Sequence, residues 1–203
     1  MTERLIHLEV NGRRHAVAVE PQAVLLHTLR DLGYTDVKNG CEIGECGACA
    51  VFLNGEAVNS CMVLAMQADG AKIITNAGLG TMEKPHMIQE AFADAGAIQC
   101  GFCTPGMVIS TKALLDRNPD PSEEEIRDAL SGNLCRCTGY GQIVEAVRLS
   151  AERLRDLPSI PGSSRCEDAR SHSKRGREFD SSNRILESDL DKTSRANAEG
   201  GAA

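Results

Sequence analysis

The chain has 203 residues, of which 41% are hydrophobic and only 3% aromatic, and its formal net charge is −7. This length allows one or two small domains with aliphatic cores. The acidic balance argues against nucleic acid as a partner, and no apolar run approaches the roughly 18 residues that indicate a membrane span.

The first part of the chain has the pattern of β-strands. Apolar and polar residues alternate on both sides of Asn11-Gly12 and again on both sides of Asn54-Gly55. Such a pair suits a two-residue hairpin turn, because both turn positions need a positive φ. A short helix is expected over Val24–Leu32, where Gly33 can end it, and a further strand over Lys72–Thr75.

Further along, the apolar spacing becomes helical. Pro85 can begin a helix that Gly96 ends, and Thr104-Pro105 combines an N-cap residue with proline at the first helical position. Ser122–Glu125 fits a capping box at the start of a third helix. A fourth helix is expected from near Tyr140 to Arg155. Four short helices predict a small bundle.

These patterns predict an α+β chain in three parts. Residues 1–78 form a strand-rich domain, residues 79–155 form a helical domain, and residues 156–203 form a tail that is expected to be disordered. The N-terminus alternates like a strand and lacks the apolar stretch of a signal peptide, so a cytoplasmic location is expected. In that reducing compartment, nine cysteines are more typical of metal ligands than of disulfides.

The first four cysteines have a spacing with chemical meaning. Cys41, Cys46, Cys49 and Cys61 follow the pattern C-x4-C-x2-C-x11-C, and its first three positions match plant-type [2Fe–2S] ferredoxins. Glycines between them permit the unusual backbone angles of a loop that wraps a cluster. A structural zinc site is the alternative, but zinc sites usually pair two C-x2-C-type knuckles, which a lone Cys61 fits poorly.

The next four cysteines form two close pairs. Cys100 and Cys103 are spaced C-x2-C, and Cys135 and Cys137 are spaced C-x-C. Both pairs are expected at helix N-termini, where free N–H groups and the helix dipole stabilise an anionic thiolate-bound cluster. By spacing alone, a zinc site stays open here as a stronger rival. The ninth cysteine, Cys166, falls in the expected tail.

The residues around these cysteines carry a family resemblance. Over about residues 4–155, the chain resembles the small iron–sulfur subunit of the molybdenum hydroxylases, the family of xanthine dehydrogenase, aldehyde oxidase and carbon monoxide dehydrogenase. The resemblance implies a β-grasp, ferredoxin-like domain followed by a four-helix bundle that also binds a cluster. The matching motifs are Gly40–Cys49, Gln99–Gly106 and Gly132–Tyr140.

The same resemblance implies cofactors and partners. It implies two [2Fe–2S] clusters, a large partner subunit with molybdopterin and molybdenum, and commonly a medium subunit with FAD. In the family, the positions of Gln99 and Cys137 lie against the pterin of the large subunit. The implied ligands are Cys41, Cys46, Cys49 and Cys61 for the first cluster, and Cys100, Cys103, Cys135 and Cys137 for the second.

No catalytic residue is expected on this chain. It has neither a G-x-G-x-x-G fingerprint nor a Walker loop, and no acid/base pair is identified by spacing. The predicted function is electron transfer from the molybdenum subunit to a flavin or other acceptor. Val37–Gly47 looks most similar to the xanthine (purine) dehydrogenases. Carbon monoxide, aldehydes, nicotinate and other N-heterocycles stay open as substrates. Two other functions also stay open, namely a free-standing ferredoxin-like carrier and a zinc-stabilised interaction module.

Overall fold

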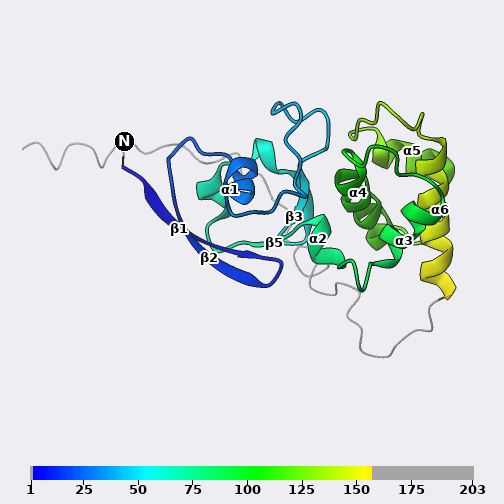
Figure 1. Cartoon of the computed structure of the whole chain (residues 1–203), viewed down its shortest axis with the longest axis horizontal. Coiled ribbons are helices and arrows are strands. Elements are labelled where there is room, and N and C mark those ends of the chain that lie inside the picture. The colour runs from blue at the N-terminus through cyan, green and yellow to red at the C-terminus, as the bar shows by residue number, and fades with distance from the viewer. Residues whose placement is uncertain (1, 157–203) are drawn as a thin grey trace, which may run out of the picture. The chain divides into compact units, whose positions relative to one another are not determined.

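The strands of the first part form one mixed sheet with a helix against it. The computed structural model of the chain describes residues 2–156 (Figure 1). The sheet has the strand order β2-β1-β5-β3-β4, in which β1 and β5 are parallel and the other neighbours antiparallel. The strands are β1 (Arg4–Val10), β2 (Arg13–Val19), β3 (Ala50–Leu53), β4 (Glu56–Asn59) and β5 (Lys72–Ile74).

Both predicted Asn-Gly hairpins are confirmed. Asn11 and Gly12 have φ values of 50° and 79° between β1 and β2, and Asn54 and Gly55 have φ values of 51° and 90° between β3 and β4. The turn asparagines also hold the rest of the sheet. Asn11 Oδ1 accepts a hydrogen bond from the N–H of Thr75, the residue that follows β5, at 2.9 Å.

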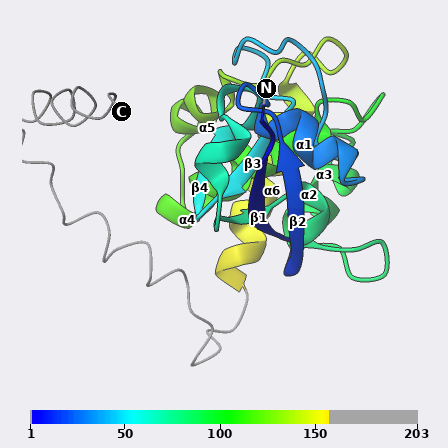
Figure 2. The ribbon, with the colours of Figure 1, turned by 90° about the vertical axis from the view of Figure 1, so that its left-hand side faces the viewer.

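The predicted short helix is also confirmed as α1 (Leu25–Asp31), and Gly33 follows its end with a φ of 94°. Its side chains Leu25, Leu26 and Leu29 are fully buried in one core with the inward residues of β1, β3 and β5. Figure 2 shows α1 beside the β1–β2 hairpin. One helix on a mixed sheet is the arrangement expected of the β-grasp domain.

The second part is helical, as its apolar spacing predicts. A second core lies among these helices and is centred on large buried side chains such as Phe92, Met107, Ile126 and Ile143. A smaller apolar cluster joins this part to the sheet, because Ala50 and Phe52 of β3 contact Ile109. The helices are α2 (Asn76–Leu79), α3 (Met87–Asp94), α4 (Thr104–Arg117), α5 (Glu123–Leu130) and α6 (Gly141–Asp156).

Two helix starts differ in detail from the prediction. Helix α3 begins after His86 instead of at Pro85, and His86 Nδ1 accepts the N–H of Ile88 at 3.2 Å. Helix α4 begins one residue early, so that Cys103 is its N-cap residue and Thr104 its first residue. The predicted capping box of α5 is confirmed, since Ser122 Oγ accepts the Glu125 N–H at 3.3 Å.

The expected boundary at residues 78 and 79 falls inside α2, and residues 2–156 all belong to one compact unit. The turn Thr81–Lys84 links α2 to α3. Lys84 N–H donates to Thr81 Oγ1 at 3.2 Å, and Met82 is 96% exposed. Asp156 ends α6, and the rest of the expected tail, with Cys166, lies outside the described residues.

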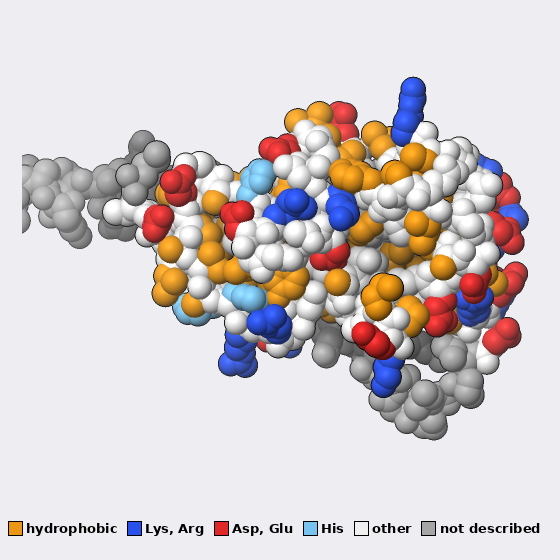
Figure 3. All heavy atoms as spheres, in the orientation of Figure 1, with side chains coloured by type: hydrophobic (Ala, Val, Ile, Leu, Met, Phe, Trp, Pro, Cys, Tyr) orange, Lys and Arg blue, Asp and Glu red, His pale blue; other side chains and the backbone are white. Residues whose placement is uncertain are grey.

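Within residues 2–156, no helix has both the length and the apolar character that a bilayer crossing requires. The face drawn in Figure 3 mixes acidic and basic side chains, with hydrophobic side chains between them.

Candidate metal centres

The first cysteine set lies mainly on one irregular loop between α1 and β3. Several residues of this loop take left-handed backbone angles, with φ values of 57° at Glu42, 81° at Gly44 and 66° at Gly47. This curvature turns backbone N–H groups toward sulfur. The N–H groups of Ile43 and Cys46 lie 3.5 and 3.4 Å from Cys41 Sγ.

Cys61 reaches this loop from the far side of the β3–β4 hairpin. It lies on a short 3-10 helix, η1 (Ser60–Met62), which directly follows β4. Ser60 fixes the approach, because its Oγ donates to the Cys49 carbonyl oxygen at 2.8 Å. Buried Cys61 thereby lies against buried Cys49, and both Cys49 and Cys41 act to raise the pKa of Cys61.

The second set joins two distant segments. Cys137 Sγ lies 3.6 Å from Cys100 Sγ, although the two residues are 37 positions apart. Cys135 also acts to raise the pKa of Cys103, so each cysteine before α4 lies near one from the α5–α6 loop. Cys100 and Cys137 are exposed, whereas Cys103 and Cys135 are partly buried.

The last helix begins at Gly141, close to the expected start near Tyr140, and Cys137 precedes it by a short non-helical segment. Gly139 and Tyr140 have φ values of 65° and 68°, which are left-handed and interrupt any helix between Cys137 and the first residue of α6, Gly141. The hydroxyl of Thr138 instead supports this pair, because it donates to Cys135 Sγ at 3.2 Å. Cys103, in contrast, does lie at a helix start, as the N-cap residue of α4.

Each set contains at least one thiol with a lowered pKa and at least one with a raised pKa. Backbone hydrogen bonds from Ile43 and Cys46 lower the pKa of Cys41 to about 7, while burial raises the pKa of Cys61 to about 11. Burial also acts to raise the pKa of Cys135, but hydrogen bonds led by Thr138 bring it to about 7.

Burial raises the pKa of Cys103 to about 12. Iron binds thiolates, so metal binding must displace protons from the buried thiols in both sets.

The arrangement of the cysteine donors bears on which metal group they can hold. Among residues 2–156, no three His, Cys, Asp or Glu side chains form a ready site for one metal ion. The cysteines approach one another in pairs instead, and in a [2Fe–2S] cluster four cysteines divide between two irons. Hydrogen bonds to sulfur at Cys41 and Cys135 also suit a cluster, whose negative charge they disperse. The residues present therefore fit the implied group.

The two cysteine sets are directly connected. The N–H of Leu134 donates to the carbonyl oxygen of Cys46 at 3.0 Å, and the amide of Asn133 donates to the Gly47 carbonyl oxygen at 3.2 Å. Tyr140 supports the same loop from behind, since its hydroxyl donates to the Asn133 carbonyl oxygen at 2.8 Å. The cysteine spacing did not predict these contacts. The only signal in the sequence was that Asn133 and Tyr140 lie inside a cysteine motif.

Gln99 and several apolar side chains lie exposed beside the cysteines. Gln99 precedes Cys100 in the loop before α4 and is exposed. The large hydrophobic side chains exposed next to ligand candidates are Ile43, Met62, Phe102 and Leu134. Each of these side chains is at least 47% exposed, so apolar surface is available near both cysteine sets.

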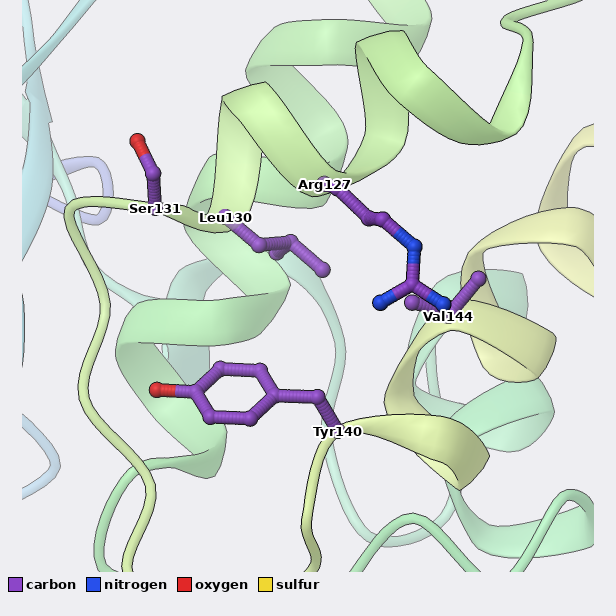
Figure 4. Close-up of a pocket in the computed structure, with 5 residues that line it drawn as sticks. All are labelled: Arg127, Leu130, Ser131, Tyr140 and Val144. Atoms are coloured by element: carbon purple, nitrogen blue, oxygen red, sulfur yellow. The ribbon is translucent and has the colours of Figure 1, made fainter.

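A shallow pocket between α5 and α6 lies apart from this chemistry. It has a volume of about 260 Å³ and contains no cysteine among its lining residues (Figure 4). The Arg127 side chain points into it but already pairs with Glu123 at 2.8 Å. The ring of Tyr140 lies on its other side, and the hydroxyl of this tyrosine holds the α5–α6 loop through Asn133.

The sequence matches two protein families in succession. Residues 8–77 match the 2Fe-2S iron-sulfur cluster binding domain, and residues 75–148 match the [2Fe-2S] binding domain. Together these matches span both cysteine sets and the contact between them.

Similar proteins occur in several oxidoreductases. The nicotinate dehydrogenase small FeS subunit of Eubacterium barkeri is 53% identical over 154 residues, which are 75% of this chain and 98% of the relative. The xanthine dehydrogenase iron-sulfur-binding subunit of Escherichia coli O157:H7 is 44% identical and matches 70% of this chain and 91% of its own length. In the crystal structure of quinoline 2-oxidoreductase from Pseudomonas putida 86, one chain is 42% identical with a TM-score of 0.72, covering 76% of this chain and 98% of that one.

Proposed function

We propose a function from the premise that this chain belongs to the family of small iron–sulfur subunits of molybdenum hydroxylases. It is therefore an electron-transfer subunit of an oxidoreductase, and its own cofactors are [2Fe–2S] clusters. Such a cluster, when bound, takes up and releases one electron at a time. The molybdopterin of these complexes is held outside the small subunit.

The proposal assigns four cysteines to each cluster. Its strongest support is the meeting of Cys100 with Cys137, because the fold brings together two exposed thiols from segments 37 residues apart, as shared ligation of a cluster requires. Cys103 and Cys135 complete that second set. The first set comprises Cys41, Cys46, Cys49 and Cys61.

The protein around the cysteines has separate tasks. The N–H groups of Ile43 and Cys46 and the hydroxyl of Thr138 disperse negative charge on sulfur and so favour the reduced state. The hydrogen bond from Leu134 to the Cys46 carbonyl oxygen gives a direct link between the two sets. The two backbone N–H groups are held by the curvature of the loop, so they need no rearrangement when charge arrives.

The second set is proposed to face the large molybdopterin subunit. Cys100, Cys137 and Gln99 are exposed there, together with apolar Phe102 and Leu134. The first set, whose Cys49 and Cys61 are buried, would then pass electrons on to an FAD subunit or another acceptor. With so many free thiols in its ligand sets, the complex is expected in a reducing compartment, the cytoplasm.

The substrate of the whole complex is proposed to contain a pyridine-type ring, as nicotinate and quinoline do. The nicotinate and quinoline enzymes named above both act on nitrogen-containing rings, as their names state. Xanthine is the second candidate, supported by the similar xanthine dehydrogenase subunit. Assay of the purified complex with nicotinate, quinoline and xanthine decides between them, and turnover of only an aldehyde or carbon monoxide contradicts both.

The electron-transfer assignment is tested by metal analysis of anaerobically purified chain. We expect about four irons and about four acid-labile sulfides per chain, because each cluster holds two of each. Reduction should give two distinct EPR signals. Stoichiometric zinc without visible absorption would contradict the assignment. Co-purification with a large molybdenum-containing chain is expected, whereas a chain that carries both clusters and never binds such a partner would favour a free-standing carrier.

A further inference from the structure

One buried side chain ties the two cysteine sets together. Asn133 is only 4% exposed, and its Nδ2 donates to the Gly47 carbonyl oxygen at 3.2 Å. Its Oδ1 accepts a hydrogen bond from Ser110 Oγ of α4 at 2.6 Å. Its backbone N–H donates to the Leu130 carbonyl oxygen of α5 at 2.9 Å. This residue therefore joins α4 and α5 to the loop of the first cysteine set.

Two glycines make this close approach possible. A Cβ atom on Gly47 would overlap the Asn133 amide and the carbonyl oxygen of Gly132. A Cβ atom on Gly106, in the first turns of α4, would overlap the Gly47 carbonyl oxygen. The Gly47 peptide is thus enclosed between α4 and the Asn133 amide, and any shift of either loop must break the hydrogen bond.

The link between the cysteine sets depends on the same register. Gly47 and Asn133 directly neighbour Cys46 and Leu134, whose backbone groups are hydrogen-bonded at 3.0 Å. Leu134 in turn precedes Cys135. A slip between the loops would therefore lengthen the hydrogen bond between Leu134 and Cys46, which connects the two sets.

We propose that Asn133 is a positioning residue that fixes the register of the two cysteine loops and thereby sets the rate of electron exchange between the two clusters. The inference rests on the proposed function, because it takes Cys46 and Cys135 as ligands of different clusters. Asn133 acts through Gly47 and the adjacent hydrogen bond, because its side-chain hydrogen bonds go to Gly47 and Ser110.

The test compares the full chain with both clusters in three forms: wild type, Asn133→Asp and Ser110→Ala. Aspartate keeps the shape of the side chain and its bond with Ser110, but it places a carboxylate oxygen against the Gly47 carbonyl oxygen. Ser110→Ala is the matched control, since it removes the bond to α4 and leaves the bond to Gly47. If the aspartate variant does not fold, uncharged Asn133→Ser, which is too short to reach Gly47, takes its place.

Three measurements report on the loops. The EPR spectrum of the fully reduced chain shows the magnetic splitting between the clusters, flash reduction gives the rate of electron exchange, and hydrogen exchange reports on the Leu134 amide. In Asn133→Asp we expect loss of the splitting, exchange of electrons slowed on the order of tenfold, and faster amide exchange, with iron content unchanged. Ser110→Ala should resemble the wild type in all three.

Wild-type splitting, rate and amide exchange in the position-133 variants would overturn the inference. Equal losses in Ser110→Ala would overturn it as well, because the cause would then be the packing of α4. Failure of the proposed function has a different signature, namely wild-type protein that lacks iron and sulfide or shows only one EPR signal.

Discussion

The two cysteine sets bring four thiols together in different ways. Three of the four cysteines of the first set come from a loop of nine residues, and its left-handed turns at Gly44 and Gly47 already direct N–H groups to sulfur. The second set exists only where the segments before α4 and after α5 meet, as Cys100 does with Cys137. The first site is thus mainly a property of a local sequence, and the second is a property of the folded helices.

The helices that support these sets also begin differently. Helix α1, next to the first set, has Val24 as its N-cap residue and no side-chain cap. In the second part, His86 caps α3 and Ser122 caps α5 through side-chain hydrogen bonds. Helix α4, which has Cys103 of the second set as its N-cap residue, has no side-chain cap either, so of these four helices only α3 and α5 have starts that side-chain caps fix.

The largest expected effect comes from removing one ligand of either set. In Cys46→Ser and in Cys135→Ser, we expect iron to fall from about four to about two per chain, because each cluster needs four cysteines. Iron analysis and EPR measure this, and each variant should keep the EPR signal of the other cluster. A variant that loses both signals would break the comparison, since the two sites would then not form independently.

A second effect concerns the place where the two regions touch. Gly47→Ala should lower the free energy of unfolding by about 3 kcal/mol or more, because it combines a left-handed backbone with overlap against Asn133. Denaturant unfolding measures the loss. The matched control is Gly96→Ala, which has nearly the same φ, 64°, but open space around the added methyl group.

We expect this control variant to lose only about 1 kcal/mol. Equal losses in the two variants would show that the contact between the regions contributes nothing beyond backbone strain.

A third and smaller effect is a change in the reduction potential of the second cluster alone. Thr138→Val removes the hydrogen bond that Oγ1 donates to Cys135 Sγ at 3.2 Å. Because that bond favours the more negative, reduced state, the potential of the second cluster should fall by about 40 mV, which corresponds to about 1 kcal/mol for one electron. Redox titration followed by EPR measures it. Thr138→Ser should stay near wild type, and a shift of the first cluster instead would reverse the assignment.

The smallest expected effect is a dependence of the free energy of unfolding on pH that comes from His86, the N-cap residue of α3 in the helical region. The pKa of His86 is lowered, first by burial and then by Lys112, against the opposite influence of Asp116 and Glu90. The unfolded chain therefore binds the proton more readily. The contribution of His86 to stability is complete above its ordinary pKa of about 6.5 and is lost as the pH falls through the lowered value.

His86→Asn keeps an N-cap acceptor but does not titrate. Unfolding measured from about pH 7.5 down to about pH 5.5 should therefore show a shallower decline in this variant than in the wild type. Identical slopes would mean that His86 does not contribute to the pH dependence, and that the cap is equally stable in both charge states.

The features that the sequence predicts well are local ones. The hairpins at Asn11-Gly12 and Asn54-Gly55, and the capping box at Ser122, depend on the backbone preferences of neighbouring residues, so their patterns are readable without the fold. The loop of the first cysteine set belongs to the same class. The exact helix starts at Cys103 and His86 were missed because their position depends on how the preceding loop leaves the packed core.

The features that stayed hidden are tertiary. The role of Asn133 depends on Gly47, which is 86 residues away, and nothing in the local sequence tells a buried bridging amide from an exposed one. The left-handed backbone of Gly139 and Tyr140, which separates Cys137 from α6, is likewise set by the folded loop and is not predicted by the local sequence. Ligation by Cys100 and Cys137 was predicted from the family motif, since their spacing alone also suits zinc.

The exposed turn Thr81–Lys84 has a consequence for how the chain could be divided. It is the covalent passage from α2 to α3, yet nearly all of the Met82 surface is open to a protease. Two contacts join the two halves without any residue of this turn. Ala50 and Phe52 contact Ile109, and Gly47 is hydrogen-bonded to Asn133. A chain nicked at Met82 would thus be expected to remain one particle, and the two halves could be supplied as separate polypeptides that assemble through these contacts.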